Sequence, residues 1–443
     1  MPPHDPAATA VPLAPAEPVG PRTGGDDVPE SREARRYARK AVLASAAGYG
    51  LEGFDLLILS FALSAVATGL HLSTAQAGSL TTVTLVGCVV GGLVFGMLAD
   101  RLGRVRVLSW SIVVFAVFTG LTALSQNLPE IAASRFVAGM GIGGEFGIGM
   151  ALAAEAFPAR KRARGTSYVG LGWQAGVLAA ALVSGPVIGA WGWRALFALG
   201  VVPALAAFLF RRTMAEPAAF TEARRAPRPA TAPLRTLVAT PAARRASIGV
   251  LVLTSVQNFG YYGLMTWLPS YLSQQFGYSL TRSGAWTAVT VLGMAAGILA
   301  FGHLADRIGR RPTFWIFQAG SVVAVLAYAS LTSPAALLVG GAVMGAFVNG
   351  MTGGYGALIA ELYPTHARAT AQNVLFNLGR GVGGLAPLVV ALVAGSWGFQ
   401  RAIALLAVIY VLDMAAMLLI PERKGAALGD EDLGTAAAAT GRG

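Results

Sequence analysis

Glu52 and Asp55 stand inside a long apolar segment of the sequence, where a charged side chain is costly. Their spacing of three residues would place both carboxylates on one face of a helix. Two neighbouring carboxylates in an apolar environment cannot both be ionised cheaply, so the pair is a candidate proton carrier. The alternative is a structural role, in which Arg side chains or backbone donors of an adjacent helix bind them.

Arg380 is the complementary charge in another apolar segment, within the glycine-rich run 379–384. Glycines let a partner approach the guanidinium closely, and its parallel N–H groups fit a carboxylate. We therefore expect Arg380 to hold the negative charge of a substrate. A permanent ion pair with Glu52, Asp55 or Glu145 is the alternative, and a substrate that displaced the internal carboxylate would combine both roles.

Glu145 and Arg135 share a third apolar segment but lie about 15 Å apart along a helix, so they cannot contact each other. Glu145 lies in a glycine-rich run that predicts close helix packing, and we expect it to contribute to proton coupling. Arg135 lies nearer the segment end, where proton access and hydrogen bonding to helix-end carbonyls are equal alternatives.

A nine-residue motif occurs twice. GMLADRLGR begins at Gly96 and GHLADRIGR begins 206 residues later at Gly302, with seven identical positions. The same offset relates AEAFP at 154–158 to AELYP at 360–364, so the chain is an internal duplication. Two similar halves that share an axis are typical of membrane transporters, whose substrate site lies between the halves.

Each copy of the motif stands at the end of an apolar segment. Arg residues there can be explained as anchors of the membrane orientation, but this does not explain why both copies also have an Asp. We expect a gate that closes when the acid binds donors of the opposite half. Its expected members are Asp100, Arg101, Gly103 and Arg104 with Glu155, and Asp306, Arg307, Gly309 and Arg310 with Glu361.

Polar side chains within other apolar segments are candidate substrate ligands. Gln174 is included because the repeat places it where Arg380 lies in the second half. Each residue has helix packing as its alternative role. The candidates besides Arg380 are Gln174, Asn258, Tyr261, Tyr262, Tyr355 and Asn377.

The composition predicts an all-α membrane protein, because 55% of the 443 residues are hydrophobic and only 12% are charged. Twelve apolar segments are long enough to cross a bilayer core of about 30 Å as helices. They are 41–68, 78–99, 106–126, 130–157, 165–190 and 193–211 in the first half, and 246–272, 284–304, 313–332, 335–362, 370–396 and 400–420 in the second.

The domain organisation follows from these segments. Two six-helix halves span 41–211 and 246–421, and a basic, Pro-rich cytoplasmic linker spans 212–245. Residues 1–40 are expected to be a disordered cytoplasmic tail, and 422–443 a second cytoplasmic tail. Nearly all of the 33 Lys and Arg then fall on one side, which places both termini in the cytoplasm of a multi-pass plasma-membrane protein.

Several classes of function are excluded. The net charge of +12 follows the positive-inside pattern and does not indicate a nucleic-acid partner. The four His and one Cys have no metal-ligand spacing, and the glycine runs lack the Lys-Ser/Thr of a phosphate loop. We therefore expect no metal, no cofactor and no enzyme activity. A gradient must drive transport, and we expect a functional monomer in the lipid bilayer.

The repeated GxLADRxGR loop resembles the signature of the major facilitator superfamily, and RFVAGMGIGG from Arg135 resembles its second motif. The resemblance covers nearly all of 41–420 and implies the twelve-helix fold of that superfamily. Glu52-Gly53-Phe54-Asp55 and Gly379-Arg380-Gly381 resemble motifs of aromatic-acid/proton symporters, the former also of sialate/proton symporters, although those families have Asp where this chain has Glu52. Gly143-Gly144-Glu145 is similar to sugar, sialate and other metabolite symporters.

The function that follows from residues and resemblance together is a proton-coupled symporter. It would import a small organic anion, an aromatic acid or another carboxylate, by alternating access. A drug/proton antiporter and a sugar/proton symporter of the same fold are the alternatives. Arg380 disfavours the antiporter, because a deep cation repels the cations that such exporters carry.

Overall fold

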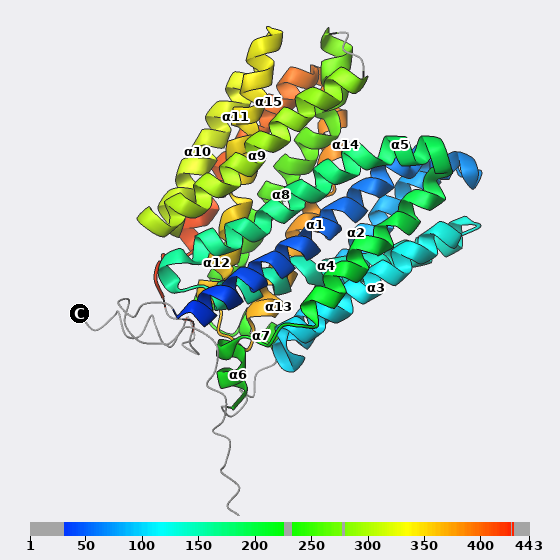
Figure 1. Ribbon diagram of the computed structural model, residues 1–443. Coiled ribbons are helices and arrows are strands. Elements are labelled where there is room, and N and C mark those ends of the chain that lie inside the picture. The colour runs from blue at the N-terminus through cyan, green and yellow to red at the C-terminus, as the bar shows by residue number, and fades with distance from the viewer. Residues whose placement is uncertain (1–30, 226–232, 277–279, 427, 429–443) are drawn as a thin grey trace, which may run out of the picture.

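The computed structural model describes residues 31–225, 233–276, 280–426 and 428. Most of the tail 1–40, part of the linker and most of the tail 422–443 therefore lie outside the described residues. The described chain is helical throughout and contains no strand. Its helices form two bundles, which come together near α6 (Ala218–Arg225) and α7 (Pro233–Thr236) and diverge away from them (Figure 1).

The first bundle contains six membrane-spanning segments in five helices. They are α1 (Arg32–Gly69), α2 (Thr74–Leu102), α3 (Arg104–Leu124), α4 (Leu128–Ala156) and α5 (Arg162–Arg211), with a short 3-10 turn (Ala159–Lys161) before α5. The long α5 is two spans joined at Gly192, whose φ of 78° breaks the helical conformation. That break falls between the segments 165–190 and 193–211 of the sequence analysis.

The second bundle also contains six membrane-spanning segments. It comprises α8 (Pro241–Phe276), α9 (Leu280–Ile308), α10 (Arg310–Ala329), α11 (Pro334–Gly350), α12 (Thr352–Leu362), α13 (Arg368–Gly383), α14 (Ala386–Trp397), α15 (Phe399–Ala416) and a 3-10 turn (Met417–Leu419). The pairs α11/α12 and α13/α14 each form one interrupted span. The fold is therefore twelve spans in two halves of six, as the apolar segments predicted.

One boundary differs from the sequence-based expectation. Helix α1 begins at Arg32, because Ser31 caps it by accepting a hydrogen bond from the Ala34 backbone N–H. The final residues of the expected disordered tail are therefore helical. The basic linker contains two short helices, α6 and α7.

Glycines make the turns between the motif loops and the following helices. Gly103 precedes α3 with a φ of 119°, and Gly309 precedes α10 with a φ of 108°. L-residues rarely adopt this conformation, so the glycine of each motif copy is required by the backbone. The turn brings the preceding Asp and the following Arg of each copy together as an ion pair, at 3.1 Å for Asp100–Arg104 and 3.2 Å for Asp306–Arg310.

Candidate functional site

A narrow cavity lies between the two halves, deep in the molecule. It is lined mainly by aromatic rings and amide side chains, with one guanidinium. The lining residues are Tyr49, Trp173, Gln257, Asn258, Tyr261, Tyr262, Asn349, Thr352, Phe376 and Arg380. An apolar wall with a few fixed polar groups is the usual composition of a small-molecule site.

Arg380 of α13 forms an ion pair across the halves with Glu52 of α1. The distance from Arg380 Nη2 to Glu52 Oε1 is 2.5 Å, and both side chains are at most 2% exposed. Asn377 orients the guanidinium, because its Oδ1 accepts a hydrogen bond from Arg380 Nη1 at 3.2 Å. Among the described residues, neither Arg380 Nε nor either Glu52 oxygen has a hydrogen bond of good geometry. The Arg therefore retains a donor for a further anion.

Two aromatic rings lie close to the guanidinium. Its central carbon lies 5.5 Å from the ring centre of Trp173 and 5.1 Å from that of Phe376. Trp173 Nε1 also donates a hydrogen bond to the Tyr261 hydroxyl at 2.9 Å, which links α5 to α8 across the halves. A planar anion bound to Arg380 would therefore meet ring faces and edges.

Asp55 does not lie against Glu52 but is bound within the first half. Arg135 Nη2 of α4 lies 2.7 Å from Asp55 Oδ2, and the Thr119 hydroxyl of α3 donates to Asp55 Oδ1 at 2.7 Å. The expected mutual repulsion of the two carboxylates is therefore replaced by two separate ion pairs. One joins the halves and the other fastens α1 to α3 and α4.

Glu145 of α4 is also paired, with a residue that was not among the candidates from sequence. Arg211, the last residue of α5, donates from both terminal nitrogens to Glu145 at 3.1 and 2.7 Å. The Ser111 hydroxyl donates to Glu145 Oε1 at 2.7 Å. Glu145 therefore does not line the cavity, and any part in coupling must act through this pair.

The motif acids bind helix N-termini of the opposite half. Asp100 at the end of α2 accepts the backbone N–H groups of Ala369 and Thr370, at 3.1 and 2.8 Å, in the first turn of α13. A carboxylate suits that position because the first N–H groups of a helix lack partners and carry partial positive charge. Arg104 Nη2 lies 3.1 Å from the same carboxylate.

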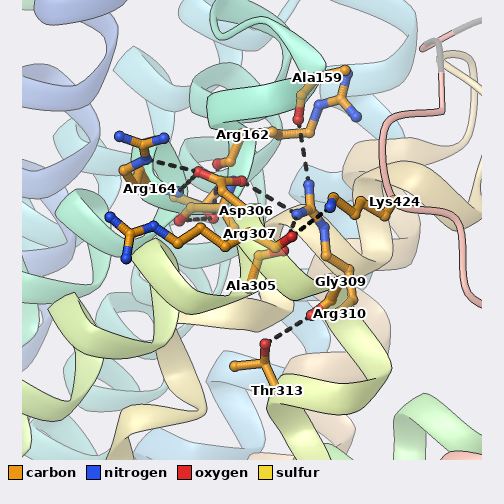
Figure 2. Close-up of polar contacts among 12 residues, drawn as sticks. Ala159, Arg162, Arg164, Ala305, Asp306, Arg307, Gly309, Arg310, Thr313 and Lys424 are labelled. Carbon is orange, nitrogen blue, oxygen red and sulfur yellow. Dashed lines mark hydrogen bonds and ion pairs between the residues drawn. The ribbon is translucent and has the colours of Figure 1, made fainter.

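The second copy makes the mirrored contact. Asp306 at the end of α9 accepts the N–H groups of Ala163 and Arg164, at 3.0 and 3.1 Å, in the first turn of α5. Figure 2 shows the Arg164 and Arg310 side chains converging on this carboxylate, at 3.1 and 3.2 Å. The two contacts close the molecule at its Arg-rich end.

Glu155 and Glu361 complete this closed end. Arg104 lies 3.1 Å from Glu155 and Arg310 lies 2.6 Å from Glu361, which are the partners expected from sequence. Arg101 and Arg307, expected members of the same gate, instead have exposed side chains. They lie beside the gate and contribute charge at the molecular surface.

Four further residues of this end were not among the gate members expected from sequence. Arg368 of the second half binds Glu155 at 2.8 Å, and Arg162 of the first half binds Glu361 at 2.7 Å. Glu216 accepts the first N–H groups of α3, and Glu422 accepts those of α10. The 206-residue offset relates Arg162 to Arg368 and Glu216 to Glu422, so the repeat itself carried the signal.

The structure divides the expected substrate ligands into two groups. Asn258, Tyr261 and Tyr262 line the cavity. Gln174, Tyr355 and Asn377 do not. The Tyr355 hydroxyl donates to the Leu253 carbonyl, and Asn377 Nδ2 donates to the Gly143 carbonyl, so both pack helices. Gln174 is buried, and no described residue hydrogen-bonds its amide.

Six lining residues were absent from the expected ligands: three aromatic residues, two amides and Thr352. Tyr49, Trp173 and Phe376 are ordinary core residues by type, so their place beside Arg380 depends on packing. Gln257 and Asn349 hydrogen-bond each other across α8 and α11 at 2.7 Å. Their positions within apolar segments were the available signal.

Comparison with known proteins places this geometry in context. The profile of the Major Facilitator Superfamily matches residues 45–292 and 251–439. A Haemophilus influenzae protein with a provisional name as a metabolite transporter is 57% identical over 399 residues, 88% of this chain and 98% of that protein. The cis,cis-muconate transport protein of Acinetobacter baylyi is 32% identical over 350 residues, 78% of this chain and 84% of its own.

An aromatic acid is the cargo named for a further relative. The 3-(3-hydroxyphenyl)propionate transporter of Escherichia coli is 30% identical over 380 residues, covering 84% of this chain and 92% of that protein. Among solved structures, a proton:xylose symporter bound to 6-bromo-6-deoxy-D-glucose superposes with a TM-score of 0.75 at 19% identity, over 89% of this chain and 98% of that one. At that identity the likeness concerns the fold alone.

Proposed function

The chain belongs to the Major Facilitator Superfamily, and we propose that it is a proton-coupled symporter that imports a small organic anion by alternating access. The substrate class we infer is a carboxylate with a planar or unsaturated body. The observation that carries the proposal is the Arg380–Glu52 ion pair in an aromatic cavity between the halves.

The pair can couple substrate to proton through one residue. A buried guanidinium requires an anion in every state, because an unpaired charge at that depth is costly. When a substrate carboxylate binds Arg380, the Glu52 carboxylate loses its counter-ion. Because an unpaired charge at that depth is costly, Glu52 then binds a proton. Glu52 reaches Arg380 from the opposite half, so this exchange also alters a contact between the halves.

The remaining buried pairs have supporting roles in this proposal. Asp55 and Arg135 join three helices of the first half and provide a second site at which a proton can replace an ion pair. Glu145 acts through Arg211 at the end of α5. Both pairs lie within the first half, so protonation there would change the packing of that half as it moves.

The cavity wall supports the substrate class. Trp173 and Phe376 flank Arg380 closely enough to stack on a planar anion, and Gln257 and Asn258 offer amides for additional polar groups. The names of two relatives agree, since one is a muconate carrier and the other carries a hydroxyphenyl acid. Arg380 disfavours the drug/proton antiporter.

We propose that the Arg-rich end is the cytoplasmic gate of a plasma-membrane protein that works as a monomer, with both termini inside. The concentration of Lys and Arg at this end supports the orientation. The acids Asp100 and Asp306 then hold the cytoplasmic side closed by capping helices of the opposite half. Release of substrate would require both caps to break.

Uptake into proteoliposomes tests the function. Labelled benzoate, cis,cis-muconate, nicotinate, sialate and a hexose are offered with an imposed pH gradient, acidic outside. We expect accumulation of a carboxylate that a protonophore abolishes. Accumulation of the hexose alone would establish the sugar symporter, and proton-driven expulsion of a lipophilic cation would establish the antiporter. Either result would overturn the proposal.

A further inference from the structure

A groove lies on the outer surface of the first half, between the start of α3 and the end of α5. Helix α6 lies near this end of α3 (Figure 1). The groove is lined by arginines and by apolar and aromatic side chains; the residues that matter here are Arg106, Arg211, Arg212, Trp110, Val113 and Phe208. Trp110 is 43% exposed and Val113 38%, so the groove opens toward lipid.

The polarity of the groove changes with depth. Arg106 lies in the first turn of α3, and Val113 is seven residues further on, which is about 10 Å deeper along the helix. Arg212 follows the last residue of α5, and Phe208 lies one turn deeper. Cations therefore stand at the membrane boundary and apolar side chains stand inside it, which is the polarity of a lipid molecule.

The two outer cations have no internal counter-ion. The Arg106 guanidinium lies 5.7 Å from the Trp110 ring centre, and that of Arg212 lies 5.8 Å from the Phe208 ring centre. Within the described part of the chain, no carboxylate forms an ion pair with either. The acid of the groove, Glu216, is already engaged, because it accepts two backbone N–H groups of α3.

A buried donor provides a second, independent indication of a ligand. Arg211 lines the groove and is fully buried; its terminal nitrogens bind Glu145, but its Nε has no hydrogen-bond partner among the described residues. Buried N–H groups are rarely left unpaired. The repeat places Met417 and Leu418 where the first half has Arg211 and Arg212, so the pair of cations is specific to the first half.

We propose that this groove binds an anionic phospholipid of the leaflet that faces the Arg-rich end. Arg106 and Arg212 hold the phosphate, and an acyl chain lies along Trp110, Val113 and Phe208. Basic pockets between membrane helices bind such headgroups. Arg211 lies between the groove and Glu145, so the bound lipid would lie beside the residue that holds this buried ion pair. The site is independent of the substrate cavity and of the transported cargo.

Native mass spectrometry of the purified full chain tests the site, with phosphatidylglycerol and phosphatidylcholine as probes. The wild type is expected to retain one phosphatidylglycerol in preference to phosphatidylcholine. The double variant Arg106→Gln/Arg212→Gln should bind it about 10- to 30-fold more weakly, given the contribution of each Arg near an anionic lipid. The control Arg244→Gln/Arg245→Gln removes two exposed charges outside the groove and should bind as the wild type does.

A second pair of variants tests the acyl chain without a change of charge. Val113→Trp fills the groove and should displace the lipid, whereas Val117→Trp, one turn further along α3 and outside the groove, should not. Glycerol 3-phosphate, which has a phosphate and no acyl chain, should not compete. Equal retention in the groove and control variants, or full competition by glycerol 3-phosphate, would overturn the proposal.

Discussion

Arg380→Gln is the perturbation that tests the proposed coupling most directly. A hydrogen bond to a charged group contributes about 1.5–3 kcal/mol. With about 1.4 kcal/mol for each tenfold change, removal of one such bond weakens binding of a carboxylate substrate roughly 10- to 150-fold. Arg380→Lys keeps the positive charge but loses the two parallel N–H donors of the guanidinium. Its affinity for the carboxylate substrate should therefore fall between those of the wild type and Arg380→Gln.

Stability has to be separated from binding, because the Arg380–Glu52 pair is buried. Removing one partner of a buried ion pair costs about 3–5 kcal/mol, since the other charge is left uncompensated. Each single neutral variant should therefore unfold at a lower temperature than the wild type. The double variant Glu52→Gln/Arg380→Gln leaves no unpaired charge and should recover most of that loss.

The assay is calorimetric titration of purified protein with the carboxylate that the uptake panel selects. Glu52→Gln removes the internal competitor for Arg380 and should bind this anion more tightly than wild type, yet fail to accumulate it in a pH gradient. The stable double variant should bind it about 10- to 150-fold more weakly than Glu52→Gln does, because these two variants differ only at Arg380. Equal affinity in the double variant and Glu52→Gln would refute the reasoning and assign Arg380 a structural role only.

Three further predictions concern the other buried groups. Asp55→Asn should abolish pH-driven accumulation while the protein still exchanges substrate across the membrane; unchanged accumulation would exclude Asp55 from coupling. Asp100→Asn or Asp306→Asn should reduce turnover about tenfold or more, with dissociation constants within about twofold of wild type; weakened binding at unchanged turnover would contradict a gate. Gly103→Ala should lower the melting temperature, because Gly103 has a φ of 119° and an added Cβ would clash with the Glu216 carboxylate. The control Gly185→Ala places its Cβ in open space and should melt as the wild type does. Equal melting temperatures of the two variants would refute this reasoning.

The sequence predicted the architecture because its signals are local or periodic. Segment length and hydropathy fixed the spans, and the kink at Gly192 falls between two of them. The repeat offset located both gate acids, and the pairing of Arg104 with Glu155 followed from their placement at neighbouring span ends. Such features depend on distance along the chain and on membrane depth, which a sequence records directly.

The partners of the charged residues were decided by tertiary structure. Spacing gave Glu52 and Asp55 the same depth and face, but the packing of neighbouring helices gave each its own Arg. Arg211 stands at the end of the last apolar segment of the first half, and only the packing of α5 brings it to Glu145. Tyr355 likewise packs helices rather than lining the cavity, because its hydroxyl donates to the Leu253 carbonyl. A sequence states how deep a side chain lies, whereas only the packing of twelve helices determines which other side chains lie within hydrogen-bonding distance of it.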